Sequence, residues 1–505
     1  MPKRMGVFMG YEIGRFVESV EIIRLRFLLH FVRVGRFVCS ECLRTKEKYD
    51  FCFPVLESKR NFFSDKSMKG IFLTLFCFAS FLHASDWPQW LGPDRDGVWK
   101  EEGVIDSFPK DGAEVMWRVP VGYGYSGAAV VGDRVYLTDY EMETESFINN
   151  PGKAVKVEGV ERLLCLELES GKIIWKHEAK RPYELSYPGG PRVTPVIDEG
   201  KVYSLGAMGD LMCLEAKSGK VIWEVNLPEK FGGKTPIWGH SAHPLIHGDL
   251  VYVLGGGEGE LALALDKKTG EKKWGALTAP EIGYCPPTLI KHGGVEQLLI
   301  WTPLELTSLN PADGSVYWAK PLKPNYNMSV TAPRMSGNRL FASGIGRVGA
   351  MYELSSEKPE AKTLWKGKAK NAVYTSNSTP VIVDEVIYGV DIDTSQLMAV
   401  SMEDGERLWG TTKPTVGEEG SRVRHGTAFV TYHAPSKLFY LWNEVGELII
   451  AELSPEGYKE RSVTKILEPT NEAFKRPVVW SAPAFAKKSV LVRNDKELVR
   501  VNLAK

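Results

Sequence analysis

The sequence is poor in cysteine, carries no excess of charge, and lacks an apolar run long enough to cross a bilayer. Only seven cysteines occur among 505 residues, no two of them are adjacent, and the haem-attachment pattern Cys-x-x-Cys-His is absent. Lys plus Arg number 63 and Asp plus Glu also number 63, so the formal net charge is zero. A neutral chain has no broad electrostatic attraction for nucleic acid, and the charge balance excludes that class of partner.

The longest apolar run lies at residues 70–82, after a basic start at Met68–Lys69. It ends at Leu82–Ala84, which gives the tripartite form of a secretory signal and is too short to span a bilayer comfortably. We therefore predict a signal peptide at residues 68–84, cleavage at its end, and export to the periplasm or cell envelope with no transmembrane segment remaining. Residues 1–67 lack the pattern found downstream, and we interpret them as a non-native or disordered extension.

The dominant pattern is a short cassette, best seen at residues 209–223. Leu211, Cys213 and Glu215 alternate with their neighbours at the period of a β-strand. The Ser-Gly pair that follows this strand supplies Gly219, which tolerates the positive φ that a tight hairpin requires. The cassette closes on Val-Ile-Trp, which favours a second strand.

This cassette recurs along most of the chain. Its terminal tryptophans fall 44 to 51 residues apart, at positions 175, 223, 274, 318, 365 and 409. The copy that ends at Trp365 is degenerate, because Pro359 replaces the glycine turn. Another strand pair precedes each cassette, as at residues 193–205. Four strands per repeat of this length predict the blades of a β-propeller.

The pattern Leu-Asp-x-x-Thr-Gly-x-x-x-Trp at residues 265–274 resembles the repeat of pyrroloquinoline-quinone (PQQ) dehydrogenase-like propellers. That family includes dehydrogenases, kinase-like sensors and the non-catalytic outer-membrane assembly lipoprotein BamB, and its repeat tryptophan docks on the neighbouring blade. The Trp- and Pro-rich segment 86–93 resembles the opening arm of exported members. The resemblance implies the propeller fold and leaves the activity open. The paired Gly-His and Trp-Asp signature of WD40 propellers is absent.

The blades can be counted. Residues 115–119 resemble an outermost strand without inner strands, and residues 482–501 give three inner strands without an outer one, so the two termini share one blade. Seven further blades lie at about 127–177, 192–227, 242–277, 285–322, 330–367, 378–412 and 426–467. We predict an all-β, eight-bladed propeller over 113–505 that leaves no free edge around the ring. An N-terminal arm, 85–112, should lie against the ring and bury its tryptophans.

Residues that precede the innermost strands should converge on one face of the ring. Polar and aromatic candidates there form a predicted binding site: Arg192, Trp238, His240, His243, Tyr284, Asn377, Arg424, His425 and Trp480. Arginines and aromatic rings suit an anionic or sugar-like ligand. The same side chains could instead bond neighbouring blades and close the ring.

Two further features belong to that face: a pair of histidines and a long insertion. His240 and His243 point to opposite faces of a strand, so no metal site is predicted. The insertion 141–159 would overhang the same face, as a lid, a partner-binding loop or a disordered loop.

The resemblance also raises a redox reading. PQQ dehydrogenases use PQQ, a calcium ion, an aspartate base, a stacking tryptophan and often a disulfide between adjacent cysteines. Asp391 and Asp393 could serve as carboxylates or only shape a turn, and no cofactor residue of the family can be matched one by one. Cys165 and Cys213 occupy equivalent repeat positions, as buried thiols or as a disulfide.

We hypothesise an exported, non-catalytic propeller that binds an envelope protein or small ligand at its funnel face, with envelope assembly as one form. The alternative is a PQQ- and calcium-dependent alcohol or sugar dehydrogenase.

Overall fold

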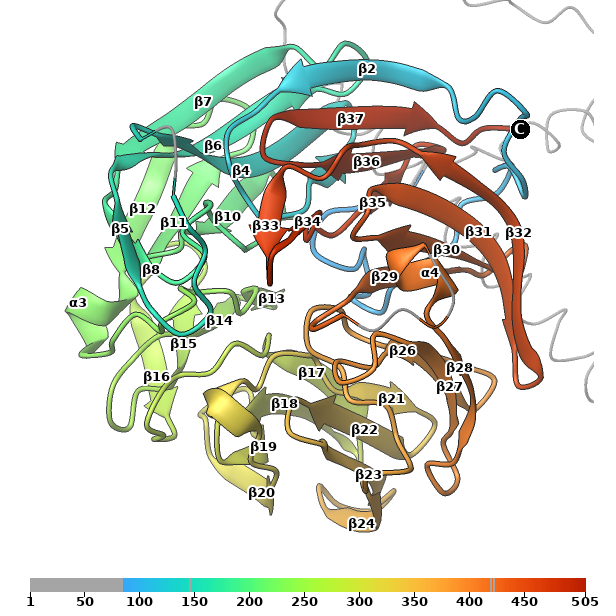
Figure 1. The fold of residues 1–505 in the computed structure, drawn as a ribbon. Coiled ribbons are helices and arrows are strands. Elements are labelled where there is room, and N and C mark those ends of the chain that lie inside the picture. Colours follow the sequence, from blue (N-terminus) through green and yellow to red (C-terminus); the bar gives the residue numbers. More distant parts are fainter. Residues whose placement is uncertain (1–84, 145–146, 418–419, 421–422) are drawn as a thin grey trace, which may run out of the picture. The chain divides into compact units, whose positions relative to one another are not determined.

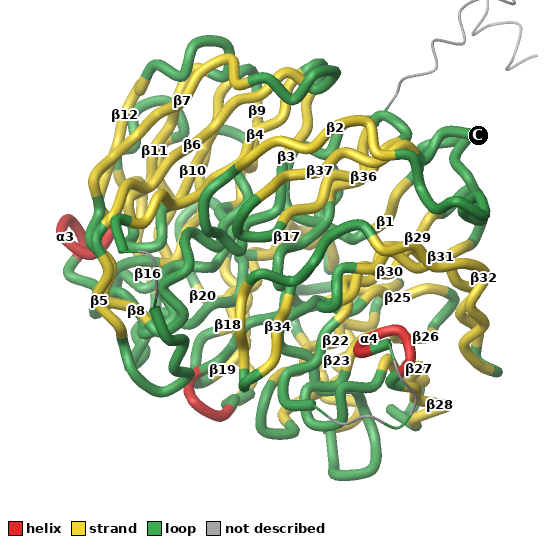
Figure 2. Tube along the Cα trace, turned by 45° about the horizontal axis from the view of Figure 1, so that its top comes forward, coloured by secondary structure: helices red, strands yellow, loops and turns green. Residues whose placement is uncertain are grey.

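The computed structural model describes residues 85–144, 147–417, 420 and 423–505. The predicted extension 1–67 and signal peptide 68–84 lie outside the described residues. Apart from α3 (Leu227–Phe231), α4 (Lys413–Val416) and the 3₁₀ turn η1 (Asn325–Asn327), the described elements are strands. Figure 2 shows these short helices in red among yellow strands. None of them is long and apolar enough to cross a membrane.

Eight sheets are arranged around a ring (Figure 1), as the repeat count predicted. Six of them consist of four sequential antiparallel strands each. Blade 1 contains β3 (Ala129–Val131), β4 (Arg134–Met142), β6 (Gly159–Glu167) and β7 (Ile173–Lys180). Blade 2 contains β9 (Val196–Asp198), β10 (Lys201–Leu205), β11 (Asp210–Glu215) and β12 (Val221–Asn226). Blade 3 contains β13 (Leu245–His247), β14 (Leu250–Leu254), β15 (Ala262–Asp266) and β16 (Lys272–Ala276). Blade 4 contains β17 (Thr288–His292), β18 (Val295–Trp301), β19 (Glu305–Leu309) and β20 (Val316–Pro321). Blade 5 contains β21 (Arg334–Ser336), β22 (Arg339–Gly344), β23 (Val348–Leu354) and β24 (Ala361–Lys366). Blade 6 contains β25 (Val381–Val383), β26 (Val386–Val390), β27 (Leu397–Ser401) and β28 (Arg407–Thr411).

The eighth blade joins the two ends of the ring. Strand β2 (Val115–Pro120) pairs antiparallel with β37 (Glu497–Asn502), and β36 (Ser489–Arg493) and β35 (Ala484–Ala486) complete the sheet. Trp117 faces Arg500 across this pairing. The predicted closure is therefore confirmed, and it removes the free sheet edges that an open ring would leave.

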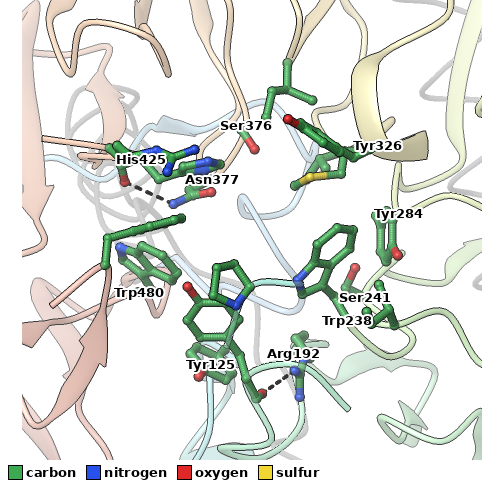
Figure 3. A pocket seen from close by; sticks show the side chains of 18 of the residues that line it. Tyr125, Arg192, Trp238, Ser241, Tyr284, Tyr326, Ser376, Asn377, His425 and Trp480 are labelled. Atoms are coloured by element: carbon green, nitrogen blue, oxygen red, sulfur yellow. Dashed lines mark hydrogen bonds between the residues drawn. The ribbon is translucent and has the colours of Figure 1, made fainter. Parts of the chain in front are cut away.

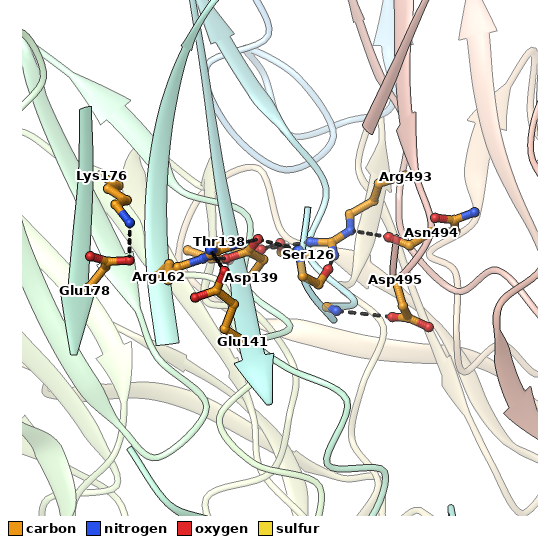
Figure 4. Close-up of polar contacts among 12 residues, drawn as sticks. Ser126, Thr138, Asp139, Glu141, Arg162, Lys176, Glu178, Arg493, Asn494 and Asp495 are labelled. Carbon is orange, nitrogen blue, oxygen red and sulfur yellow. Dashed lines mark hydrogen bonds and ion pairs between the residues drawn. The ribbon is translucent and has the colours of Figure 1, made fainter. Parts of the chain in front are cut away.

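Polar contacts reinforce this closure on the side of blade 1 (Figure 4). The buried guanidinium of Arg493 donates to the backbone oxygens of Thr138, at 2.9 Å, and Gly122. Within blade 1, Arg162 forms a bidentate pair with Asp139, at 2.7 and 2.6 Å. The last blade is therefore bonded to the backbone of the first, rather than only packed against it.

The repeat tryptophans join each blade to the next. Their indole Nε1 atoms donate to a backbone oxygen of the following blade at 2.7–3.1 Å, in these pairs: Trp117 to Leu168, Trp175 to Ala216, Trp223 to Lys267, Trp274 to Pro311, Trp365 to Met402 and Trp409 to Ser454. The docking implied by the family resemblance is confirmed. It also explains the glycine of the cassette, because in five of these six seams the indole packs on that glycine of the next blade.

Two of the eight seams lack this bond: the outer strand of blade 7 contains no tryptophan, and the degenerate cassette explains the seam between blades 4 and 5. Where Pro359 replaces the glycine turn of blade 5, Trp318 of blade 4 has no glycine to pack on. Its indole instead donates to Gln297 Oε1 of its own blade at 2.9 Å. The blade 4–5 seam is therefore held without the tryptophan bond of its neighbours.

The N-terminal arm contributes a strand that the sequence did not predict. Strand β1 (Val98–Trp99) pairs in parallel with β29 (Ala428–His433), as a fifth strand of the blade that also contains β30 (Leu438–Asn443), β31 (Glu447–Ser454) and β32 (Gly457–Lys465). Trp87 and Trp99 are only 2% and 1% exposed, whereas Trp90 is half-buried, so the predicted burial of the arm tryptophans is confirmed for two of the three.

The arm also crosses the axis of the ring. Trp87 exchanges backbone hydrogen bonds with Val130 of blade 1, while Arg95 donates to the backbone oxygens of Pro244 and His243 in blade 3. Arg334 of blade 5 donates to the backbone oxygen of Arg95 at 2.6 Å. Because these partners belong to inner strands around the ring, the arm closes the central channel at one end; Figure 1 shows it in blue at the centre.

We expect the glycine turns that receive a tryptophan to resist substitution. Gly219 and Gly200 both have φ of 73°, but a Cβ on Gly219 would lie 2.5 Å from Trp175 Cε3, whereas nothing lies within 4 Å of a Cβ on Gly200. Gly200→Ala should cost about 1–2 kcal/mol for the left-handed backbone. Gly219→Ala should cost about 1–3 kcal/mol more, because the indole must shift. Free energies of unfolding in denaturant measure both, and equal costs would contradict the docking argument.

The ring closure should also depend on pH through Asp495. Burial raises its pKa to about 6, while it accepts hydrogen bonds from Gly124 N at 3.2 Å and Thr470 Oγ1 at 3.4 Å. A raised folded-state pKa means that the folded chain binds the proton more tightly. Stability therefore falls as pH rises from about 4 to 6.

Asp495→Asn should remove this effect. We expect it to raise the free energy of unfolding at pH 7 by up to about 3 kcal/mol relative to the natural chain, with the advantage lost below pH 4. Denaturant titrations at both pH values measure it, with the exposed Asp133→Asn as control. A variant equally destabilised at both pH values would overturn the assignment.

Candidate functional site

One face of the ring is hollowed by a cavity of about 500 Å³, the funnel cavity, whose lining residues Figure 3 shows. The loops before the innermost strands supply much of its wall. Seven of the nine predicted residues line it: Arg192, Trp238, Tyr284, Asn377, Arg424, His425 and Trp480. The structure thus brings together side chains that lie up to almost 300 residues apart in the sequence (residues 192 to 480).

The two other predicted residues do not line this cavity. His240 is 2% exposed and lies beside Gly209, and burial lowers its pKa to about 4. His243 lies deeper, where its ring stacks on Trp90 at 4.8 Å between centroids. The described residues contain no group of three His, Cys, Asp or Glu side chains placed to hold an ion.

A smaller space of about 160 Å³ continues from the funnel toward the arm. It shares Tyr125 and Arg192 with the funnel wall and ends on Trp87 and Trp90. The arm therefore contributes part of the wall of this inner space.

Four aromatic residues of the wall were missed by sequence reasoning. Tyr125 directly precedes a residue that the blade pattern places at the funnel. A prediction shifted by one residue toward the N-terminus would have included Tyr125. The others lie in loops that carry no repeat signal: Tyr187, Tyr326 and Phe474. Together with Trp238, Tyr284 and Trp480 they give the cavity seven Tyr, Trp or Phe side chains among its 19 lining residues.

Several of these residues have a strained backbone. Tyr187, Tyr326, His425 and Phe474 adopt φ of 52°, 59°, 57° and 51°. Bulky side chains seldom occupy the left-handed region, and such strain tends to persist at functional sites, where the surroundings hold it. The wall of the funnel is therefore built at some conformational cost.

Two insertions frame the mouth. Strands β5 (Val155–Val157) and β8 (Tyr183–Leu185) pair with each other, as do β33 (Asn471–Ala473) and β34 (Arg476–Val478). Asn149 Nδ2 of the first insertion donates to Asn471 Oδ1 of the second at 2.7 Å. The interpretation of 141–159 as a disordered loop is wrong for its described part, because Pro151 and Gly152 line the cavity.

The charged groups of the wall differ in their partners. Arg192 is half-buried over the ring of Tyr125, at 5.1 Å, and donates to backbone oxygens of residues 186, 187 and 190. Arg424 lies over Phe474 at 5.2 Å and is exposed, and it makes no hydrogen bond or ion pair with the described residues. One guanidinium at the mouth is therefore available to an anion.

Trp480 is held by a buried carboxylate behind the wall. Glu444 accepts from Trp480 Nε1 at 3.2 Å and forms a bidentate pair with Arg476, at 2.8 and 3.1 Å. Burial raises the pKa of Glu444 despite this pairing. Glu444 thereby fixes the orientation of the indole that faces the cavity.

The wall also contains hydrogen-bonding groups without partners. Buried and unpaired within the described residues are the hydroxyls of Tyr125, Tyr187, Tyr284 and Ser376. Buried polar groups are almost always bonded, so unpaired ones in a cavity call for a ligand or ordered water. No Asp or Glu is among the described residues that line the funnel. The arrangement can stack a flat ring, donate hydrogen bonds and attract an anion.

The candidate carboxylates and cysteines lie elsewhere. Asp391 is fully buried and accepts from Thr394 N and Tyr374 N, so it shapes a turn. Asp393 pairs with Arg347 at 3.1 Å. Cys165 and Cys213 are buried free thiols, and the disulfide reading is wrong.

Comparisons with known proteins agree with this architecture. BamB from Moraxella catarrhalis is similar in structure, with 14% identity and a TM-score of 0.50 over 77% of this chain and 99% of that chain. Quinohemoprotein alcohol dehydrogenase from Comamonas testosteroni has 12% identity and a TM-score of 0.51 over 83% and 81%. At these identities the similarity shows the fold alone. No curated protein sequence matches the chain.

The sequence of the chain also matches the model of a protein family. The family model described as outer membrane protein assembly factor BamB matches residues 159–411, just over half of the chain. The matched segment contains the tryptophan cassettes that form the ring. The chain therefore belongs to this family of PQQ-repeat propellers.

Proposed function

We propose that this protein is an exported, non-catalytic propeller that binds a small anionic ligand with flat rings in its funnel cavity. The observation that carries the proposal is the set of unpaired hydroxyls in an aromatic cavity beside the free guanidinium of Arg424. A cavity of about 500 Å³ is within the range of small-molecule sites. A concave site of this kind suits a small ligand better than the surface of a folded protein partner.

Ring closure alone does not account for the wall. Contacts that close the ring lie in the seams and in the eighth blade, where Arg493 and the docked tryptophans are fully bonded. The funnel side chains instead leave bonding capacity unused and hold strained backbones. Groups that served only the ring would be expected to find partners in neighbouring blades.

The residues present do not fit a PQQ–calcium centre. Calcium takes six to eight oxygen ligands and usually several carboxylates. Within the part of the chain that the structure describes, the funnel lining contains no Asp or Glu, Asp391 is bonded within its own turn, and Asp393 is paired with Arg347. We therefore derive no oxidation step. The proposed export rests on the sequence pattern at residues 68–84, which lies outside the described residues.

A ligand screen tests the binding proposal. Purified protein is mixed with sugar acids, aromatic acids and neutral analogues, and thermal shift and tryptophan fluorescence are recorded. We expect acidic ring compounds to bind saturably, and Trp480→Ala to weaken them by at least about tenfold, because a central indole contributes strongly to such sites. Trp409→Phe, which changes a seam tryptophan, serves as the matched control. Hits that bind Trp480→Ala unchanged would place the site elsewhere, and capture of a folded envelope protein without small-molecule hits would replace the ligand class.

The cofactor question has its own measurement. The protein is mixed with PQQ, with and without calcium, and followed by quinone absorbance and by dye reduction with alcohols and aldoses. We expect no calcium-dependent binding and no turnover, because the described lining of the cavity offers no carboxylate to the ion. Saturable calcium-dependent binding with dye reduction would establish the dehydrogenase reading instead.

A further inference from the structure

A second cavity of about 420 Å³ opens beside the funnel between blades 5 and 6, and we call it the side groove. Its lining includes Asn325, Arg347 and Asp393. It shares Tyr326, Ile345, Arg424 and His425 with the funnel. Since these shared side chains border both spaces, the two cavities adjoin along a common wall.

Tyr326 lies at the junction of the two cavities. It is 71% exposed and has φ of 59°, and Asn327 beside it has φ of 58°. Asn327 Nδ2 donates to Glu281 Oε1 at 3.1 Å, which fixes the loop. A large aromatic ring held in a strained conformation and turned to solvent gains little from packing within the chain. Its position is that of a platform for a bound ring.

The side groove carries more positive than negative charge. Arg347, itself at φ of 58°, pairs with Asp393 at 3.1 Å, while Arg424 has no partner among the described residues. Burial and the neighbouring Arg424 and Arg476 lower the pKa of His425 to about 4, so its ring is neutral at neutral pH. One carboxylate therefore faces two guanidiniums, which favours an anionic ligand.

The alternation of rings and polar groups is suited to sugars. Trp480 and Tyr326 offer flat surfaces to the C–H faces of pyranose rings, and Asn325, Asn377 and Arg347 offer donors and acceptors to hydroxyl and acid groups. A single sugar would leave one cavity empty, whereas a chain of two or more would occupy both.

An extended peptide fits the groove less well. Peptides held in sheet proteins commonly add a strand to an exposed strand edge. The lining of the side groove comes from residues 325–326, 345–347, 392–393 and 424–425, and none of them belongs to a strand. The groove therefore offers side chains rather than a backbone ladder.

We propose that the ligand of the funnel is an acidic oligosaccharide of two or more sugar units, which stacks one ring in the funnel and passes over Tyr326 into the side groove. This inference rests on the proposed function, because it assigns the ligand class and length of that same site. The acid groups lie against Arg424 and Arg347, and the neutral rings stack on the aromatic wall.

Galacturonic acid and its α-1,4-linked dimer, trimer and tetramer are the probes, with glucose and its maltose-series oligomers as neutral counterparts. Dissociation constants are measured by calorimetry at low and moderate salt. We expect affinity to rise by at least about tenfold from monomer to trimer, and each acidic probe to bind more tightly than its neutral counterpart. The acidic preference should weaken with salt, since Arg424 is exposed.

Two variants locate the effect. Tyr326→Ala should lower the ratio of trimer to monomer affinity by about tenfold, and Arg424→Gln should remove most of the preference for acidic over neutral sugars. Arg461→Gln is the matched control, because Arg461 pairs with Glu452 on the outer strand pair of blade 7. Circular dichroism melting of each variant shows that the ring remains folded.

The possible results distinguish failure of the side-groove inference from failure of the proposed binding function. Saturable monomer binding in the funnel without a gain from chain length would overturn the side-groove inference and leave the proposed function intact. Length-dependent binding of peptides but not of sugars would overturn the ligand class. Absence of any saturable small ligand, in this series and in the wider screen, would overturn both.

Discussion

The docking of a tryptophan from one blade onto the glycine turn of the next is the contact on which the ring depends. Each blade is a small sheet that cannot bury its own faces, so its stability comes from the seams with its neighbours. The indole supplies both a large apolar surface and a hydrogen bond to the neighbouring backbone, as in Trp223 with Lys267. The glycine, at Gly270 in this seam, leaves the room that a side chain would fill.

The N-terminal arm lies across one end of the central channel of the ring. A propeller without it would have an open channel, but Trp87 and Trp99 are buried among inner strands and Arg95 bonds carbonyls of two further blades. The arm thereby contributes part of the wall of the inner space next to the funnel. A wall that excludes water from a ligand strengthens polar contacts.

Positive charge near the axis is held in an unusual way. Arg493 is buried and Arg95 and Arg192 are half-buried, and their hydrogen bonds run to backbone oxygens and, for Arg95, also to Gln89 Oε1. Burial lowers the pKa of Arg95 to about 9, with Arg334 as a second cause. Carbonyl dipoles thus solvate these guanidinium groups.

The sequence by itself determined the eight blades, the shared closing blade and seven of the funnel residues, since strand period, glycine turns and repeat spacing are local or periodic properties. It did not determine β1, the hairpin around Phe474 or the side groove, because those segments carry no repeat and their positions follow from contacts between distant residues. His240 illustrates the limit: it is 2% exposed and does not line the funnel, whereas the next residue, Ser241, does. Such details are decided by packing, where the surroundings select a side-chain direction that sequence spacing leaves open.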